Sequence, residues 1–210
     1  MPSLRVDPAS FDVAALRPAA AWLREGGVVG FPTDTFYGLA ADPRSPAAIQ
    51  DLFDLKGRSP DAAIPLIAGS RLQVEETCGS LGAAGTRLAA RFWPGPLALL
   101  VDAPASIGAA VHAGTGAIAV RVPDHPIARA LALVWGGLIT ATSANVSGEA
   151  PGTTAASLDG LAARGRVFVI DGGTTPGGAP STIVDARLSP PRLVRAGAVA
   201  WERVLESLQA

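Results

Sequence analysis

The 210-residue sequence has very few side chains that bind transition metals or form disulfides. It contains one cysteine, Cys78, and two histidines, His112 and His125. A single cysteine cannot close an internal disulfide, and these three residues are too few for a structural zinc site. We therefore expect neither a disulfide framework nor a metal site built from protein ligands.

Long apolar runs are also missing, although 49% of the residues are hydrophobic and the mean hydropathy is +0.33. Gly, Pro or Arg interrupts every apolar stretch before it reaches the roughly 20 residues that a membrane-spanning helix needs. Residues 1–7 lack the apolar segment of a signal peptide. A net charge of −1 argues against a protein whose main affinity is for the nucleic-acid backbone. We expect a cytoplasmic globular protein with no membrane partner.

Lysine is the scarcest charged side chain. All but one of the 17 Lys and Arg residues are arginine, and the exception is Lys56. Drift toward an arginine-rich composition explains this count as well as a specific need for one ammonium does. An ammonium is a compact point charge that binds a phosphate or carboxylate oxygen at one point, unlike a planar guanidinium. Lys56 is therefore the first candidate site residue.

Strand-like and helix-like segments alternate without a linker long enough to separate two domains. We predict a single α/β domain over residues 1–210, with its core at about 18–197 and a C-terminal helix at about 201–208. Short strands after Val167 favour a twisted sheet of mixed strands flanked by helices. The predicted helices lie at about 18–26, 45–57, 82–92, 126–135, 153–163 and 201–208, and the predicted strands at about 27–31, 64–68, 97–101, 117–122, 138–141, 167–171, 182–185 and 193–194.

Familiar catalytic motifs are absent. The sequence has no Gly-Lys-Ser/Thr of a P-loop and no G-x-S-x-G elbow. Residues 114–119 spell a dinucleotide-binding fingerprint, but they precede a strand instead of joining a strand to a helix, so we interpret them as a turn. His125 lies at a predicted helix start, where capping is the expected role. Ser-His-Asp chemistry is therefore disfavoured.

Polar residues gather where predicted strands end. Residues 31–39 place three hydroxyls and a carboxylate in a predicted loop, and residues 140–148 place five hydroxyl or amide side chains after another strand. Residues 56–58, 180–185 and 195–197 add further polar or cationic clusters. An ordinary Asx or Ser/Thr turn, or cations at a helix C-terminus, would also explain the first cluster and residues 56–58.

Arg121 lies inside an apolar strand, in Ala119-Val120-Arg121-Val122. A buried guanidinium needs an anionic partner, and no carboxylate lies beside it in the sequence. A ligand carboxylate or phosphate is one candidate partner, and a distant Asp or Glu is the structural alternative.

Together these segments resemble the YrdC-like family of threonylcarbamoyladenylate synthases from about Gly26 to Gly197. The motifs that carry the resemblance are P-T-D-T-x-Y-G-L at 32–39, K-G-R at 56–58, W-P-G-P at 93–96, A-V-R-V-P-D-H-P at 119–126, T-S-A-N-x-S-G at 142–148, S-T-I-V-D at 181–185 and R-x-G at 195–197. The resemblance implies a deep concave cavity on the sheet. It also implies synthesis of threonylcarbamoyl-AMP and pyrophosphate from L-threonine, bicarbonate and ATP, for the modification of tRNA adenosine.

The resemblance also implies roles for particular residues. Lys56 and Arg58 would be catalytic, with the Lys56 ammonium near the reacting carbamate and α-phosphate. Magnesium is expected on the ATP phosphates, held mainly by phosphate oxygens and water. Expected ATP contacts are Arg58, Ala117, Ser143, Asn145, Pro151 and Arg195, and expected threonine contacts are Thr35, Arg121, Ala141 and Ser181. Asn145 would brace its loop or contact a phosphate. Downstream threonylcarbamoyl-transferase proteins are implied as partners, with direct tRNA binding left open.

The sequence departs from the family pattern in three places. Residues 59–69 are longer than in many relatives, and Gly69 stands where those relatives carry a histidine that approaches threonine. Ala150-Pro151-Gly152 replaces a proline-serine pair, so only a backbone contact carries over there. The sequence also ends soon after Arg195, without the extra C-terminal domain of some relatives.

Two other functions compete with the synthase. One is an RNA-binding member of the same superfamily, which the net charge of −1 disfavours. The other is a carbamoyl-transfer module like that of hydrogenase-maturation proteins, whose acylphosphatase and zinc-finger neighbours are not found in this sequence.

Overall fold

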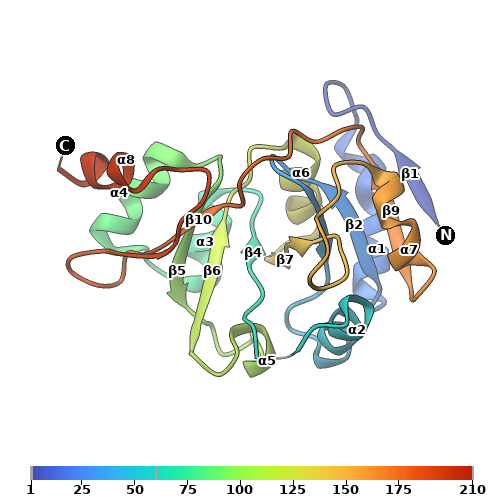
Figure 1. Ribbon diagram of the computed structural model, residues 1–210, viewed down its shortest axis with the longest axis horizontal. Helices are drawn as coiled ribbons and strands as arrows, with labels where there is room; N and C mark the ends of the chain where they lie inside the picture. The colour runs from blue at the N-terminus through green and yellow to red at the C-terminus, as the bar shows by residue number, and fades with distance from the viewer. Residues whose placement is uncertain (1, 60, 210) are drawn as a thin grey trace.

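The structure is a computed structural model that describes residues 2–59 and 61–209. Its elements form a mixed α/β fold with two sheets that follow one another along the long axis, and the two termini lie at opposite ends (Figure 1). The mixed α/β class predicted from the sequence is confirmed. The strands divide between two sheets instead of forming one.

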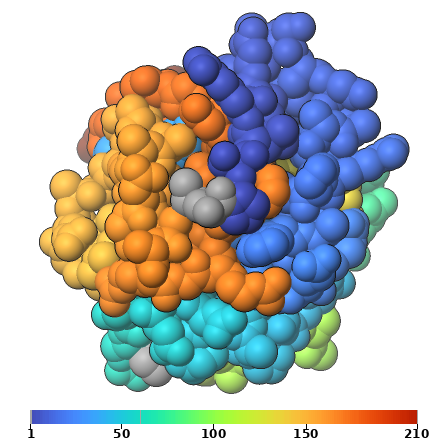
Figure 2. Space-filling view, turned by 90° about the vertical axis from the view of Figure 1, so that its right-hand side faces the viewer, coloured from blue at the N-terminus to red at the C-terminus, as the bar shows by residue number. Residues whose placement is uncertain are grey.

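The first sheet has five strands in the order β1-β9-β2-β3-β8. Its central strand β2 runs parallel to β9 and antiparallel to β3, and β1 lies parallel to β9 on the outside. Figure 2 shows β1 at the surface beside the segment that carries β9. The strands are β1 (Ser3–Arg5), β2 (Val28–Pro32), β3 (Tyr37–Ala40), β8 (Thr142–Ser143) and β9 (Val167–Asp171).

The second sheet has six strands in the order β11-β10-β5-β6-β4-β7. Parallel pairs (β10 with β5, β4 with β6) alternate with antiparallel pairs, as expected for a mixed sheet. The strands are β4 (Leu66–Ile67), β5 (Leu97–Asp102), β6 (Ala117–Arg121), β7 (Ile139–Thr140), β10 (Thr182–Asp185) and β11 (Arg192–Arg195).

Helices cover both sheets. α1 and α6 pack on each other and on β2, burying Leu23, Phe31 and Leu131, while α4 packs on α8 at the far end. Among the described residues no helix combines the length and apolar character needed to cross a bilayer. The helices are α1 (Arg17–Arg24), α2 (Pro46–Lys56), α3 (Arg71–Cys78), α4 (Gly82–Phe92), α5 (Ala109–His112), α6 (Pro126–Trp135), α7 (Asp159–Ala162) and α8 (Trp201–Gln209), with 3-10 turns η1 (Val13–Leu16) and η2 (Ala155–Leu158).

Helix boundaries follow local chemistry. α2 begins after Ser45, whose Oγ accepts a hydrogen bond from the Ala48 N–H at 3.2 Å, and Pro46 occupies the first helical position. α4 and α6 match the predicted ranges. His125 is the N-cap of α6 as expected, but its side chain makes no capping hydrogen bond, so the capping role predicted for it is wrong.

The largest departure from the predicted elements is at residues 31–39, which were expected to be a loop. They form the β2–β3 hairpin, whose turn is closed when the Thr33 N–H and Thr33 Oγ1 both donate to the Phe36 carbonyl. This tight turn returns Tyr37 and Leu39 to the core, where both are fully buried. The helix predicted at 153–163 is instead a 3-10 turn followed by the short α7, and β1, α3, α5 and β8 were not predicted.

Candidate functional site

A pocket of about 510 Å³ lies between the two sheets. Gly38 of β3 and Ser143 of β8 line it from the five-stranded sheet, and β4, β5, β6, β10 and β11 line it from the six-stranded sheet. Alternate residues of β6, namely Ala117, Ala119 and Arg121, share the pocket face because side chains alternate along a strand. The two small alanines leave space that a larger residue would fill.

The pocket brings together most of the residues predicted from the sequence. Eight line it: Thr35, Arg58, Ala117, Arg121, Ala141, Ser143, Ser181 and Arg195. They come from segments spread over more than 150 positions of the chain. Lys56, Asn145 and Pro151 are not among the lining residues.

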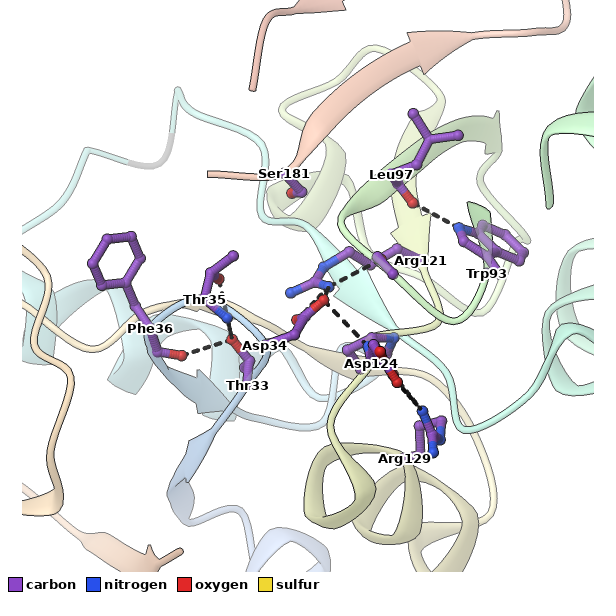
Figure 3. A network of polar contacts seen from close by, with 12 residues as sticks. Thr33, Asp34, Thr35, Phe36, Trp93, Leu97, Arg121, Asp124, Arg129 and Ser181 are labelled. Carbon is purple, nitrogen blue, oxygen red and sulfur yellow. Dashed lines mark hydrogen bonds and ion pairs between the residues drawn. The ribbon is translucent and has the colours of Figure 1, made fainter. Parts of the chain in front are cut away.

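Arg121 has a protein partner, Asp34. The distant carboxylate that the sequence left open as a partner of Arg121 is therefore present. Arg121 Nη1 donates to Asp34 Oδ1 at 2.6 Å, to Asp34 Oδ2 at 2.8 Å and to the Gly95 carbonyl at 3.2 Å (Figure 3). Both side chains of the pair are at least nine-tenths buried. All three bonds use the same nitrogen. Among the described residues, Nε and Nη2 of Arg121 have no hydrogen-bond partner, so this edge of the guanidinium can take a ligand.

Asp34 belongs to a wider polar network (Figure 3). Its Oδ2 also accepts the Asp124 N–H at 3.2 Å, and the Asp124 carboxylate pairs with Arg129 at 3.1 Å. The network fixes the loop before α6 against the β2–β3 turn, so Arg121 is held from two directions. In the sequence, Asp34 was the carboxylate of the polar cluster at residues 31–39 and had no assigned role.

Thr35, from the β2–β3 turn, lies to the left of the Arg121 guanidinium in Figure 3, and Ser181, from the segment before β10, lies above it. Thr35 Oγ1 lies 3.2 Å from Thr33 Oγ1, which fixes the hydroxyl in the turn. Ser181 accepts two bonds at its carbonyl and one at its Oγ from Arg195, at 2.7 to 3.1 Å. The pocket therefore presents two hydroxyls beside one open guanidinium edge.

Gly197 explains the spacing of the Arg195-Ala196-Gly197 motif. A Cβ at Gly197 would lie 2.2 Å from the Pro180 carbonyl oxygen and 2.6 Å from the Thr182 nitrogen. Only glycine allows the chain after β11 to pass this close to the segment before β10. The close approach places Arg195 against Ser181.

Arg58 and Arg195 differ from Arg121 because neither is paired with a carboxylate in the described part of the chain. Arg58 donates to Thr142 Oγ1 at 3.2 Å and to the Ala63 carbonyl at 3.1 Å. Burial lowers the pKa of both guanidinium groups, and the nearby charge of Arg121 lowers the pKa of Arg195 further. Two uncompensated cations at one pocket favour a polyanionic ligand.

Lys56 holds the loop after β8 instead of facing the pocket. Its side chain is 3% exposed, and its Nζ donates to the Ser143 carbonyl and, at 2.7 Å, to the Asn145 carbonyl. The Ser147 N–H in turn donates to the Lys56 carbonyl at 2.9 Å. Burial, with a smaller effect of Arg58, lowers the pKa of the ammonium to about 8, so the group remains charged at pH 7. The structure thus gives Lys56 a positioning role that the sequence did not reveal.

Asn145 and Pro151 are also not among the residues that line the pocket. Asn145 Nδ2 donates to the carbonyls of Val146 at 2.9 Å and Glu149 at 2.7 Å, which is the loop-bracing arrangement considered from the sequence. Pro151 is half-buried in the segment that follows, next to Gly152, whose carbonyl accepts the Tyr37 N–H. The expected ATP contacts of these two residues stay predictions.

Gly69 does not leave an open position for a histidine. A Cβ there would lie 2.4 Å from Leu133 Cγ and 2.6 Å from the Arg129 carbonyl oxygen, both on α6. Gly69 is also not among the pocket-lining residues. Packing of the segment after β4 against α6 therefore leaves no room for a side chain at position 69.

Other reactive groups are not arranged for catalysis. Within the described ranges no three His, Cys, Asp or Glu side chains form a group that could hold a metal ion. Burial raises the pKa of the Cys78 thiol to about 11, so it stays protonated at pH 7. Burial lowers the pKa of His125, whose Nδ1 is buried without a partner in the described structure.

Comparison with known proteins adds to this geometry. The model of the Sua5/YciO/YrdC family, described as telomere recombination, matches residues 21–197. The chain belongs to this family. The mixed α/β fold, the pocket between the sheets and the motif order thus agree with the resemblance seen in the sequence.

Several curated relatives of the chain are named threonylcarbamoyl-AMP synthases. The chain is 36% identical over 200 residues to a threonylcarbamoyl-AMP synthase of Bacillus subtilis, covering 94% of this chain and 58% of that protein. It is 38% identical over 165 residues to one of Thiobacillus denitrificans, covering 79% and 87%. The crystal structure of P. abyssi Sua5 complexed with L-threonine superimposes with a TM-score of 0.87 at 33% identity, covering 99% of this chain and 60% of that chain. The chain thus spans little more than half of the B. subtilis and P. abyssi proteins.

The bonds of the buried Lys56 ammonium to two backbone carbonyls predict that a substitution of Lys56 changes both the stability of the protein and its binding of ATP. We expect Lys56→Arg to lower the free energy of unfolding by about 1–3 kcal/mol, because a guanidinium overfills a site where the ammonium is almost fully buried. Urea unfolding measures the change in stability, and ATP titration measures the change in ligand binding. Arg44→Lys, at an exposed position, is the control. If Lys56→Arg keeps full stability and loses only product formation, the ammonium acts directly on the reacting groups, as the sequence predicted.

The Arg121–Asp34 pair predicts that single and double substitutions differ. Arg121→Leu leaves Asp34 buried without its cation, so we expect it to lower the free energy of unfolding by roughly 3–5 kcal/mol. Asp34→Asn combined with Arg121→Leu should recover part of that loss while threonine binding remains absent. The measurements are chemical denaturation and threonine titration. Threonine binding by the double variant would show that Arg121 is only structural.

Proposed function

We propose that the chain is a threonylcarbamoyl-AMP synthase domain that converts L-threonine, bicarbonate and ATP to threonylcarbamoyl-AMP and pyrophosphate. The observation that carries the proposal is the pocket itself. It combines an open guanidinium edge and two hydroxyls with two cations that have no carboxylate partner. The synthase names of the family relatives point to the same reaction. The RNA-binding alternative is not favoured, because no observation on the structure supports it over the synthase.

Threonine fits the end of the pocket around Arg121. The free Nε and Nη2 edge of Arg121 suits a carboxylate, which accepts two parallel hydrogen bonds from such a fork. The Thr35 and Ser181 hydroxyls are the polar neighbours available to the threonine side chain, with the Ala141 backbone nearby. The L-threonine complex of the P. abyssi relative supports this choice of ligand.

The ATP phosphates fit between Arg58, Ser143 and Arg195. In the reaction the threonine amine and bicarbonate form a carbamate anion with loss of water, and a carbamate oxygen attacks the α-phosphate and expels pyrophosphate. Both reactants are negative, so the two unpaired guanidinium groups lower their repulsion in a pocket with a mainly apolar wall. Lys56 contributes by holding the Ser143 backbone in place.

Magnesium would enter with ATP. The residues that the structure describes along the pocket include no carboxylate, so phosphate oxygens and water would supply the ligands. When bound, the ion would neutralise phosphate charge during the displacement. The proposal also includes downstream threonylcarbamoyl-transferase proteins as users of the product, and a cytoplasmic location follows from tRNA as the final acceptor.

The proposal predicts strict dependence of product formation on all three substrates. Purified protein with ATP, magnesium, bicarbonate and threonine should release pyrophosphate and yield a threonylcarbamoyl adenylate detectable by mass spectrometry. Arg195→Leu should reduce the rate by at least about ten-fold, because it removes an unpaired cation at the phosphates. Arg44→Leu, outside the pocket, is the matched control. Pyrophosphate release that does not require threonine would refute the assignment.

Amino-acid choice gives a second prediction. A site that hydrogen-bonds a substrate hydroxyl rejects analogues without it far better than it rejects the loss of a methyl group. We therefore expect serine to be activated detectably and 2-aminobutyrate to be the poorer substrate, measured as pyrophosphate release at equal concentration. If 2-aminobutyrate equals or exceeds serine, the pocket recognises shape, and Thr35 and Ser181 do not bind the hydroxyl.

A further inference from the structure

A fourth arginine, Arg187, lines the pocket at the end away from Arg121. It follows β10, where Asp185 pairs with Leu100 of β5, and Asp102 at the end of β5 pairs with Ala117 of β6. Ala117 and Arg121 are four residues apart on one strand, which separates the two ends by roughly 13 Å at about 3.3 Å per residue. Neither the motifs nor the threonine and phosphate contacts use Arg187.

Two carboxylates fix the plane of the Arg187 guanidinium. Nε and Nη2 donate to the two oxygens of Asp185 at 2.9 and 2.8 Å, and Nη1 donates to Asp102 Oδ1 at 2.8 Å. The Arg187 N–H also donates to Asp185 at 3.1 Å. About a third of the side chain remains exposed, although all three of its nitrogens are bonded. The group therefore offers the pocket a rigid flat face and few free donors.

The charge of Arg187 is already balanced, unlike that of Arg58 and Arg195. Asp185 and Asp102 offset the guanidinium charge of Arg187, and Arg192 is a further cation that acts on Asp185. The charges at this end of the pocket nearly cancel, so it attracts an anion less than Arg58 and Arg195 do. The pocket residues nearest along β5 and β6 are Leu100, Ala117 and Ala119, which are apolar and mostly small. A flat, uncharged, aromatic group suits a slot with an apolar floor and a guanidinium face.

We propose that Arg187 is a nucleobase-binding residue, which stacks its guanidinium plane on the adenine of ATP while Asp185 and Asp102 hold that plane. This inference rests on the proposed function, because ATP is the substrate that brings a base and a triphosphate together. The pocket arginines then divide by their counter-ions: Arg58 and Arg195 bind phosphates, and Arg187 binds the base. Ala117, expected to contact ATP, lies at the same end.

The test compares the binding of ATP with that of inorganic triphosphate, which has no base. Both are titrated, with magnesium, into the wild type, Arg187→Lys and the control Arg44→Lys. Arg44 is a matched control, since it forms the same two-bond fork with a carboxylate two residues away, Asp42, but lies outside the pocket. We expect Arg187→Lys to weaken ATP binding about ten-fold and to leave triphosphate binding unchanged. Arg44→Lys should change neither.

Asp102→Ala provides a second variant that does not threaten the fold, because the Asp102 side chain is 84% exposed. Removing this carboxylate frees Nη1 of Arg187 and makes its guanidinium group more mobile. ATP binding should therefore weaken slightly, while triphosphate binding stays the same. If Arg187 were a phosphate ligand, the same change would strengthen triphosphate binding, and that result would overturn the proposal. Equal loss of ATP and triphosphate binding in Arg187→Lys, or loss of neither, would also overturn it.

The results that would refute the proposed function differ from those that would refute the role of Arg187. A wild-type chain that binds ATP but forms no threonylcarbamoyl-AMP refutes the synthase and leaves the ratio of ATP to triphosphate affinity to decide the role of Arg187. A wild-type chain that binds neither ligand refutes both. If Arg187→Lys keeps full threonylcarbamoyl-AMP formation and the wild-type ratio of ATP to triphosphate affinity, only the role of Arg187 is refuted.

Discussion

The constraint on which this structure depends is the gathering of four guanidinium groups around one pocket. Like charges around one pocket repel, as the effect of Arg121 on the pKa of Arg195 shows, and burial makes the repulsion stronger. The fold resolves this by pairing Arg121 with Asp34 and Arg187 with Asp185 and Asp102, while Arg58 and Arg195 are held only by hydroxyl and carbonyl oxygens. Among the four pocket arginines, the charge without a carboxylate partner in the described residues is therefore confined to Arg58 and Arg195.

The same arrangement explains why the pocket is assembled from both sheets. The five-stranded sheet supplies Asp34 and Thr35 from a hairpin turn and Ser143 from its edge, whereas the six-stranded sheet supplies the β6 floor and Arg195. Lys56 joins the end of α2 to β8 of the five-stranded sheet, since it is the last residue of α2 and binds the Ser143 and Asn145 carbonyls. A single buried ammonium thus fixes the distance between Arg58, which follows α2, and the Ser143 loop.

Lys56 was selected from the sequence for one reason, and the structure gives it a different role. Its singular use among 17 cationic residues drew attention to it, and the expected reason was a contact with a phosphate. In the structure the ammonium is almost fully buried and bonds backbone carbonyls. We expect the bulkier guanidinium of an arginine to overfill this site, so burial gives a structural reason for a lysine at position 56.

By itself the sequence determined the mixed α/β class and the ranges of α4 and α6, because caps, Gly-Pro boundaries and apolar periodicity are local signals. Its motifs, through their resemblance to the YrdC-like family, also indicated eight of the residues that line the pocket. β3 was missed because the polar residues before it predicted a loop, although they form the turn of a hairpin with β2. β8 was missed because it has two residues and pairs with β3, which is distant in the chain. Only the tertiary structure decided that Asp34 is the partner of Arg121, that Gly69 is closed by α6, and that Asp102 and Asp185 fix Arg187. Each of these depends on contacts between residues that are brought together by packing, for which the linear sequence carries no spacing signal.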